Sequence, residues 1–255
     1  MSDITEAIQK KLDEIEKKEN IRILHCVESG SRAWGFASPD SDYDVRFVYV
    51  RERSHYLKLE QTRDVIEWQL DDVFDINGWD LQKTLRLLRK SNPTVFEWNS
   101  SPIVYRTTEI WQSMNEVINS CFDPKAGVYH YISTAASNCR AYLRGEQVKY
   151  KKYFYAVRPI LAAKWILEKG TPPPMLFDEL VQAELEDDIK PIIEMLLKLK
   201  VNSPETAFGE RIEELNNYIN VNLELLNREA EGMSSLKNGG WEELDKAFLY
   251  AVDHK

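Results

Sequence analysis

Apolar positions follow a helical period at the start of the chain. They recur every three or four residues, which places their side chains on one helix face: Ile4, Ile8, Leu12 and Ile15. Asp3 and Glu6 have the spacing of a capping box, in which a side chain and a backbone amide at a helix N-terminus satisfy each other. We therefore expect an amphipathic helix over residues 3–19.

The following segments are short apolar runs or alternate between apolar and polar residues, as strands do. We expect strands at 21–29, 43–50, 64–70 and 73–79. Successive side chains of a strand point to opposite faces. In the second segment one face would carry Asp42, Asp44, Arg46 and Val48, and the other Tyr43, Val45, Phe47 and Tyr49. That strand should pack on one face and carry charge on the other.

The pattern changes to helices after the last of these strands. Asp80 is a candidate N-cap for a helix that starts at Leu81, and Pro93 limits its continuation. Further helical periods cover 109–120, 124–144, 147–168, 176–199, 204–230 and 241–252. We therefore expect an α+β protein. A mixed sheet with flanking helices would occupy residues 1–107, and an all-helical domain would occupy residues 108–255.

Charge and composition exclude several classes of function. The 255 residues carry a net charge of -9 with a pI near 5.1, which disfavours indiscriminate binding to phosphate backbones. No stretch approaches the roughly 18 apolar residues of a membrane span, and the N-terminus lacks a signal core. Cys26, Cys121 and Cys139 form neither a disulfide framework nor a zinc motif. We expect a cytoplasmic protein with no membrane partner.

Two carboxylates stand at the start of the second strand. Asp42 and Asp44 are two residues apart, so their side chains would share a face and repel each other unless a cation compensates. Mg²⁺ prefers carboxylate and phosphate oxygens. Upstream, Gly30 permits close backbone approach, and Ser31 adds a hydroxyl at the expected start of a short helix, where amides attract anions. The alternative is ordinary turn chemistry of aspartate in "SPDSDYD".

The stretch from Gly30-Ser31 to Asp42-x-Asp44 resembles the signature of the DNA polymerase β-like nucleotidyltransferase superfamily. Two further blocks, "VFDINGWDLQKTLRLLRKSNPTVFEWNSSPIVY" and "KYKKYFYAVRPILAAKWI", are similar to its bacterial RNA-repair-associated (RlaP-like) branch, so that the resemblance spans residues 20–168. It implies that residues 1–107 are a catalytic domain and that residues 108–255 complete a nucleotide cleft. Serine replaces the first glycine of the usual double-glycine motif.

The resemblance implies the roles of individual residues. Gly30 and Ser31 would hold nucleotide phosphates, while Asp42 and Asp44 would bind two Mg²⁺ ions, with Mn²⁺ as an alternative ion. A third carboxylate on a neighbouring strand would bind metal and help to activate the acceptor hydroxyl. Asp75 is our choice for it, and the alternatives are Asp71, Asp72 and Asp80.

The implied reaction is attack by an acceptor hydroxyl on the α-phosphorus of a nucleoside triphosphate such as ATP, with release of pyrophosphate. An RNA 3′ end, a small molecule or a protein hydroxyl would each serve as acceptor, and the sequence decides neither among them nor the oligomeric state. The alternatives from other classes are a nucleotide-binding or scaffold protein without turnover, and a general RNA-binding module, against which the charge speaks.

A basic stripe lies in the segment "VKYKKYFYAVRP". Lys151, Tyr155 and Arg158 are spaced i, i+4 and i+7, which gives one stripe of a helix, and Lys152 adjoins it. We expect these four residues to contact the base and phosphates of the nucleotide. The alternative is a solvated helix face.

Overall fold

The computed structural model describes residues 3–38, 40–71, 73–202, 208–236 and 240–254, and the chain forms two compact units. The first, the sheet unit, comprises Met1–Gly30, Asp42–Cys121 and Asn238–Lys255. The second, the helical unit, comprises Ser31–Ser41 and Phe122–Lys237. The predicted boundary at 107/108 stays a prediction. In the division into compact units, Ser31–Ser41 lies in the helical unit, while the residues from 108 to Cys121 and the segment Asn238–Lys255 lie in the sheet unit.

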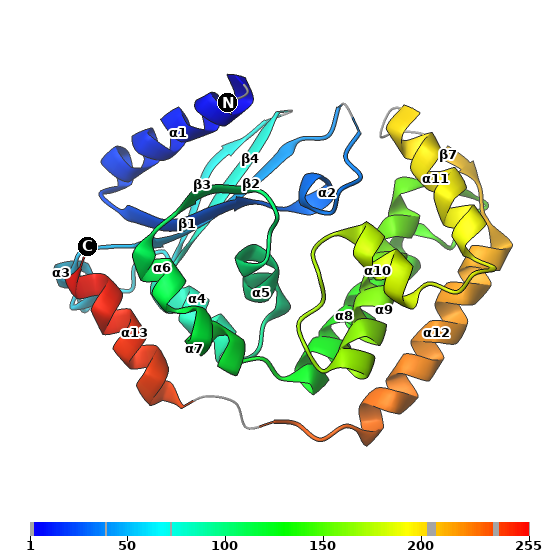
Figure 1. The fold of residues 1–255 in the computed structure, drawn as a ribbon. Coiled ribbons are helices and arrows are strands. Elements are labelled where there is room, and N and C mark those ends of the chain that lie inside the picture. Colours follow the sequence, from blue (N-terminus) through cyan, green and yellow to red (C-terminus); the bar gives the residue numbers. More distant parts are fainter. Residues whose placement is uncertain (1–2, 39, 72, 203–207, 237–239, 255) are drawn as a thin grey trace. The chain divides into compact units, whose positions relative to one another are not determined.

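The sheet unit begins with the predicted amphipathic helix and contains one five-stranded sheet (Figure 1). Its strands are β1 (Arg22–Glu28), β2 (Tyr43–Val50), β3 (Val65–Leu70), β4 (Phe74–Asp80) and β5 (Val104–Thr107). Its helices are α1 (Asp3–Glu19), α3 (Arg53–Tyr56), α4 (Leu81–Leu88), α5 (Pro93–Asn99), α6 (Glu109–Ser113), α7 (Asn115–Ser120) and α13 (Trp241–Asp253). A further short helix, α2 (Gly30–Ala33), starts at the last residue of the unit's first segment.

The sheet is mixed, with strand order β3-β4-β2-β1-β5. β2 pairs in parallel with β4, and every other pairing is antiparallel. A parallel pair needs a crossover connection, which here includes α3 and β3. The prediction of a mixed sheet with flanking helices is confirmed.

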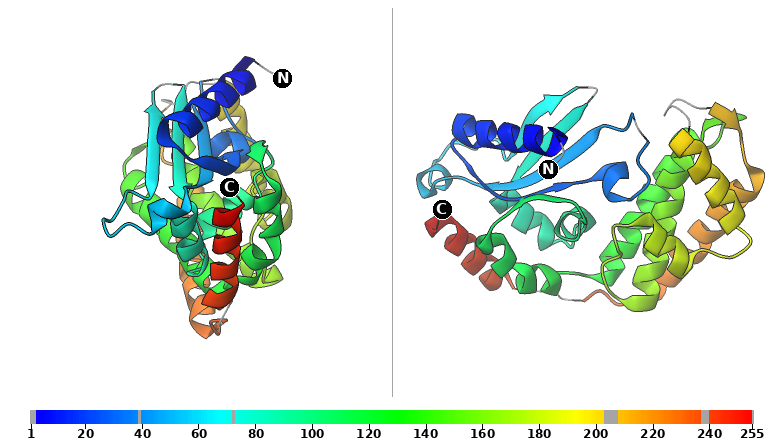
Figure 2. Two further views of the ribbon diagram at one scale, coloured as in Figure 1. Left: turned by 90° about the vertical axis from the view of Figure 1, so that its left-hand side faces the viewer. Right: turned by 45° about the horizontal axis from the view of Figure 1, so that its top comes forward.

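One face of the sheet packs against α1, which runs across it in both views of Figure 2. The contact is a single apolar cluster that includes three fully buried residues of α1 and three of β2: Ile8, Leu12, Ile15, Val45, Phe47 and Tyr49. Each such side chain contributes about 1.5–3 kcal/mol when it leaves water. The other face carries Asp44, Arg46 and Val48 of β2, and α4 also contacts this strand.

The helical unit contains five helices of eight or more residues and a small two-stranded sheet within the part of the chain that the structure describes. Its helices are α8 (Pro124–Tyr142), α9 (Lys151–Lys169), α10 (Phe177–Glu184), α11 (Lys190–Asn202) and α12 (Glu213–Gly232), and its strands are β6 (Gln147–Lys149) and β7 (Phe208–Glu210). α9 contacts α8, α10 and α12.

The expectation of an all-helical C-terminal part is therefore wrong in one respect. Residues 147–149 and 208–210 pair as antiparallel strands, although both segments were predicted to lie in helices. The predicted helix 176–199 is also two helices, because the chain turns between Leu185 and Ile189, which are both buried. There Glu186 accepts a hydrogen bond from the Tyr218 hydroxyl at 2.8 Å.

None of the helices in the described residues is both long and apolar enough to cross a membrane.

Candidate active site

Two carboxylates lie side by side where the parallel strands β2 and β4 begin. Asp44 is the register partner of Asp75, and paired residues of neighbouring strands direct their side chains to the same face. The side chains are 22% and 29% exposed, so an ion from solvent can reach both. The structure thus brings together Asp44 and the residue that we chose as the third carboxylate.

A single guanidinium bridges these two carboxylates. The Arg46 Nη2 atom lies 2.8 Å from Asp44 Oδ1 and 2.6 Å from Asp75 Oδ2. Its Nη1 atom donates to the backbone carbonyl of Asp75 at 2.6 Å and to that of Val45 at 3.2 Å. Two carboxylate oxygens that converge on one cation are the donor type that hard divalent ions prefer, so the pair fits a magnesium ion.

Gly30 lies directly against the Asp44 side chain. Its φ is +58°, in the left-handed region that favours glycine. A Cβ at this position would lie 2.0 Å from Asp44 Oδ2. The glycine therefore serves two needs at once, a left-handed turn and a backbone approach to a carboxylate. Sequence reasoning assigned the close approach to a phosphate.

A buried glutamate that sequence reasoning missed positions the start of β2. Glu28 is fully buried at the end of β1, and its Oε1 accepts a hydrogen bond from the Asp44 amide at 2.7 Å. Its other carboxylate oxygen accepts from the Tyr105 hydroxyl, whose pKa is raised by burial and by this glutamate. The signal available in the sequence was the acidic residue at the end of the strand "RILHCVE", whose residues are mostly apolar.

Asp42 lies immediately before β2 and is exposed. Among the residues that the structure describes, no three His, Cys, Asp or Glu side chains gather as a metal-binding group. The structure therefore pairs Asp44 with Asp75 but does not gather Asp42 with them. The metal roles of all three residues stay predictions.

The rivals of Asp75 have local structural roles where they are described. Asp71 Oδ1 accepts from the amides of Val73 and Phe74, both at 2.8 Å, and so closes the turn between β3 and β4. Asp80 caps α4 by accepting from the Gln82 amide at 2.8 Å. Asp72 lies outside the described residues.

The buried Asp80 carboxyl leads to a prediction about pH. Burial raises its pKa to about 6, while hydrogen bonds from Gln82 and from Tyr56 act in the opposite direction. Because the pKa is higher in the folded state than in the unfolded state, the folded protein binds the Asp80 proton more tightly. The resulting contribution to the free energy of unfolding is fully present below the unfolded-state pKa and is lost as pH rises through about 6. We expect Asp80 to lower the free energy of unfolding by on the order of 3 kcal/mol between about pH 4 and about pH 7.

Asp80→Asn is the matched variant, because asparagine also caps helices but does not ionise. Urea unfolding of both proteins across this pH range should show that the stability of the wild type falls relative to that of the variant. Parallel profiles would contradict the raised pKa.

Ser31 is buried in the short helix α2, within the segment Ser31–Ser41 of the helical unit. In the same segment, the Phe36 ring packs 4.9 Å from that of Phe154 and 5.2 Å from that of Phe177. The Phe36 amide donates to the Ser31 carbonyl at 3.1 Å. The serine is thus anchored to aromatic residues of α9 and α10.

The predicted basic stripe lies at the start of α9. The Arg158 side chain is buried at 3% exposure, with its guanidinium 4.6 Å from the Trp34 ring and 3.3 Å from the Met175 carbonyl. The Tyr155 ring also contacts Trp34, at 5.4 Å, and the Lys152 ammonium lies 4.9 Å from the Tyr155 ring. Lys151 is half-buried at the first position of the helix.

The Arg158 guanidinium is therefore not exposed to solvent, and it is not accessible to a phosphate in this structure. A phosphate would reach it only after the residues packed around it had moved. The nucleotide-binding roles of Lys151, Lys152, Tyr155 and Arg158 stay predictions.

Comparison with known proteins covers nearly the whole chain. A model of the family described as "RlaP: RNA repair pathway DNA polymerase beta family" matches residues 4–250. The uncharacterized protein YcgL of Bacillus subtilis (strain 168) is 43% identical over 244 residues, which are 95% of this chain and 94% of that protein. A nucleotidyltransferase-like protein from Exiguobacterium sibiricum 255-15, of known crystal structure, is 14% identical. That likeness covers 99% of this chain and 80% of the other, and its TM-score of 0.32 is too low to support a conclusion.

Proposed function

Because the chain belongs to the RNA repair pathway DNA polymerase beta family, we propose that Asp44 and Asp75 form the centre of its nucleotidyl-transfer site. Family membership identifies the protein as a nucleotidyltransferase and confirms the family resemblance, while the roles of its Gly-Ser and Asp-x-Asp residues stay predictions. The finer proposal is transfer of a nucleoside monophosphate from a triphosphate to an acceptor hydroxyl, with Mg²⁺ as cofactor.

One observation carries this proposal: Asp44 and Asp75 are register partners whose oxygens converge on one cationic atom. Two neighbouring carboxylates repel each other, so the Asp44–Asp75 pair needs a compensating cation. Arg46 supplies one positive charge in the structure. Divalent ions held by Asp44 and Asp75, with Asp42 as a further predicted ligand, would supply more.

The chemistry follows from these groups. The acceptor hydroxyl oxygen forms a bond to the α-phosphorus, the bond to the β-phosphate oxygen breaks, and pyrophosphate leaves with the electron pair. The hydroxyl proton passes to a base, a role that we assign to Asp75. Asp44 and Asp75 would hold divalent ions, and such ions, when bound, would supply Lewis acidity to the reaction. Arg46 keeps the two carboxylates oriented through its contacts with backbone carbonyls, and Gly30 leaves room beside Asp44.

The test has two parts. Pyrophosphate release is measured for each nucleoside triphosphate, with Mg²⁺, Mn²⁺ or a chelator, against RNA with a free 3′ hydroxyl and against small-molecule and protein acceptors. Thermal unfolding is measured with the same ions and nucleotides. Metal-dependent release supports the proposal. Metal-dependent stabilisation without release across the panel would instead favour the nucleotide-binding protein without turnover.

A further inference from the structure

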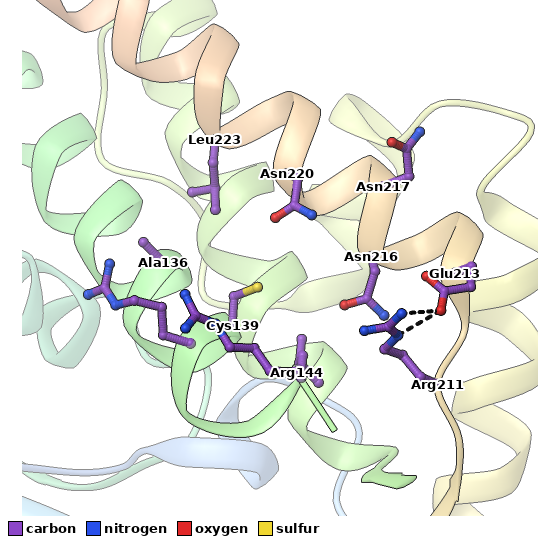
Figure 3. Close-up of a pocket in the computed structure, with 11 residues that line it drawn as sticks. Ala136, Cys139, Arg144, Arg211, Glu213, Asn216, Asn217, Asn220 and Leu223 are labelled. Carbon is purple, nitrogen blue, oxygen red and sulfur yellow. Dashed lines mark hydrogen bonds and ion pairs between the residues drawn. The ribbon is translucent and has the colours of Figure 1, made fainter. Parts of the chain in front are cut away.

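A groove of about 740 Å³ lies on the helical unit (Figure 3). Its lining residues come from positions 136–223, far along the chain from Asp44 and Asp75. One side is formed by the end of α8 and the residues that follow it, including Cys139 and Arg144. The other side is formed by the first turns of α12, from which Asn216 and Asn220 project toward those residues. All of the lining residues belong to the same unit.

The groove is locally basic in an acidic protein. It is lined by three arginines and by a single carboxylate, Glu213. Arg211 already pairs with that carboxylate, with its Nε 2.8 Å from Glu213 Oε1. Within the described part of the chain, the Arg140 side chain donates only to the Ser137 hydroxyl, at 3.3 Å, and the Arg144 side chain makes no hydrogen bond or ion pair. Two exposed guanidinium groups are therefore available to an anion.

The side-chain amide of Asn216 offers the groove an uncharged hydrogen-bonding group that is held in place. The Asn216 side-chain nitrogen donates to the Tyr153 hydroxyl at 2.8 Å and to the Ile212 carbonyl at 3.1 Å. Because Tyr153 is fully buried, the amide is held in one orientation, and its oxygen faces the groove (Figure 3). Asn220 lies one turn further on the same helix face. Leu223 and Ala136 add apolar surface.

We propose that this groove binds a nucleotide unit. Its phosphate would contact Arg140 and Arg144, while its ribose or base would contact Asn216 and Asn220. A phosphate alone would leave the amides unused, whereas ribose hydroxyls and base edges are donors and acceptors that match them. The volume is within the range of sites for single small ligands. The phosphate belongs either to a free mononucleotide or to a strand of RNA.

Cys139 offers a readout that is independent of turnover. It lines the groove and is partly exposed, whereas Cys26 and Cys121 are buried. Burial raises the pKa of all three thiols, so alkylation is carried out at mildly alkaline pH. We expect AMP, or a short single-stranded RNA, to slow the alkylation of Cys139, with Cys139→Ser as the blank.

Binding of each probe is also measured directly. Calorimetry gives the affinity for AMP, and fluorescence anisotropy gives the affinity for a labelled short single-stranded RNA. Arg144→Gln and Arg140→Gln should each weaken the affinity about tenfold, since each removes a charge-assisted hydrogen bond. Arg228→Gln is the matched control. It removes the same charge from an exposed position of α12 outside the groove and should leave the affinity unchanged.

Protection by AMP would identify a free nucleotide as the ligand, and protection by RNA alone would identify a strand. Protection by neither would overturn the proposal, as would equal effects of the groove and control variants. Protection by an acidic peptide but not by AMP or RNA would also overturn it. None of these outcomes depends on whether Asp44 and Asp75 support turnover, so the two proposals fail separately.

Discussion

Asp44→Asn should lower metal-dependent pyrophosphate release by about a hundredfold or more, because Lewis-acid stabilisation by bound ions amounts to several kcal/mol. Asp75→Asn should have an effect of similar size, since the two carboxylates are register partners. Both variants should also lose the increase in unfolding temperature that Mg²⁺ or Mn²⁺ produces in the wild type. That second readout separates failure to hold the ion from failure of a later step.

The fold should survive these substitutions. Repulsion between neighbouring carboxylates, considered alone, predicts that removal of one charge stabilises the protein slightly. In the structure Arg46 already bridges both carboxylates, and asparagine retains an oxygen that can accept its hydrogen bond. We therefore expect a loss of about 1 kcal/mol or less in the free energy of unfolding.

Asp71→Asn is the control for this pair. It removes one carboxylate charge from the turn between β3 and β4 and keeps an oxygen for the two amides that Asp71 binds. Turnover should be close to that of the wild type. Full turnover in Asp44→Asn or Asp75→Asn would show that these carboxylates do not bind the catalytic metal.

Gly30→Ala should destabilise the protein by about 3 kcal/mol or more, from a left-handed backbone and a steric clash combined. The φ of +58° disfavours any Cβ, and the added methyl would lie 2.0 Å from Asp44 Oδ2. Urea unfolding followed by tryptophan fluorescence measures the loss. Because Asp44 must move, the metal-induced rise in unfolding temperature should disappear as well.

Two control variants separate the contribution of the left-handed backbone from that of the clash with Asp44. Gly170 has a similar φ of +68° but nothing within 4 Å of its added Cβ, so Gly170→Ala should cost only the backbone strain, about 1 kcal/mol. In an Asp44→Ala background the clash disappears, and the cost of Gly30→Ala should fall toward that of Gly170→Ala. An unchanged cost in that background would mean that contact with Asp44 is not the reason for the glycine.

Some elements of the sheet unit were predictable because their signals are local. The helix over 3–19 is set by apolar spacing, and Asp80 caps α4 through its own side chain. Asp42 and Asp44 were recognisable from their distance to Gly30 and Ser31. The register that pairs Asp44 with Asp75 was not, because the partner strand of β2 is chosen by packing across the whole sheet.

The helical unit shows where local patterns fail. Residues 147–149 and 208–210 have too few positions for an alternation to be visible, and they become strands only because they pair with each other. Helical periodicity also continued through 185–189, where Glu186 bonds to Tyr218 and Lys164 and the chain turns instead. Such contacts join residues far apart in the sequence.

The sequence by itself determined the family and the order of most strands and helices, and it predicted Asp42 and Asp44 as candidate metal ligands, since these inferences depend on residue types at short spacings. Only the tertiary structure decided that Arg46 bridges Asp44 and Asp75, that Glu28 holds the start of β2, and that Arg158 is buried against Trp34. The physical reason is that long-range packing selects neighbours by shape and charge, and no local period encodes that choice.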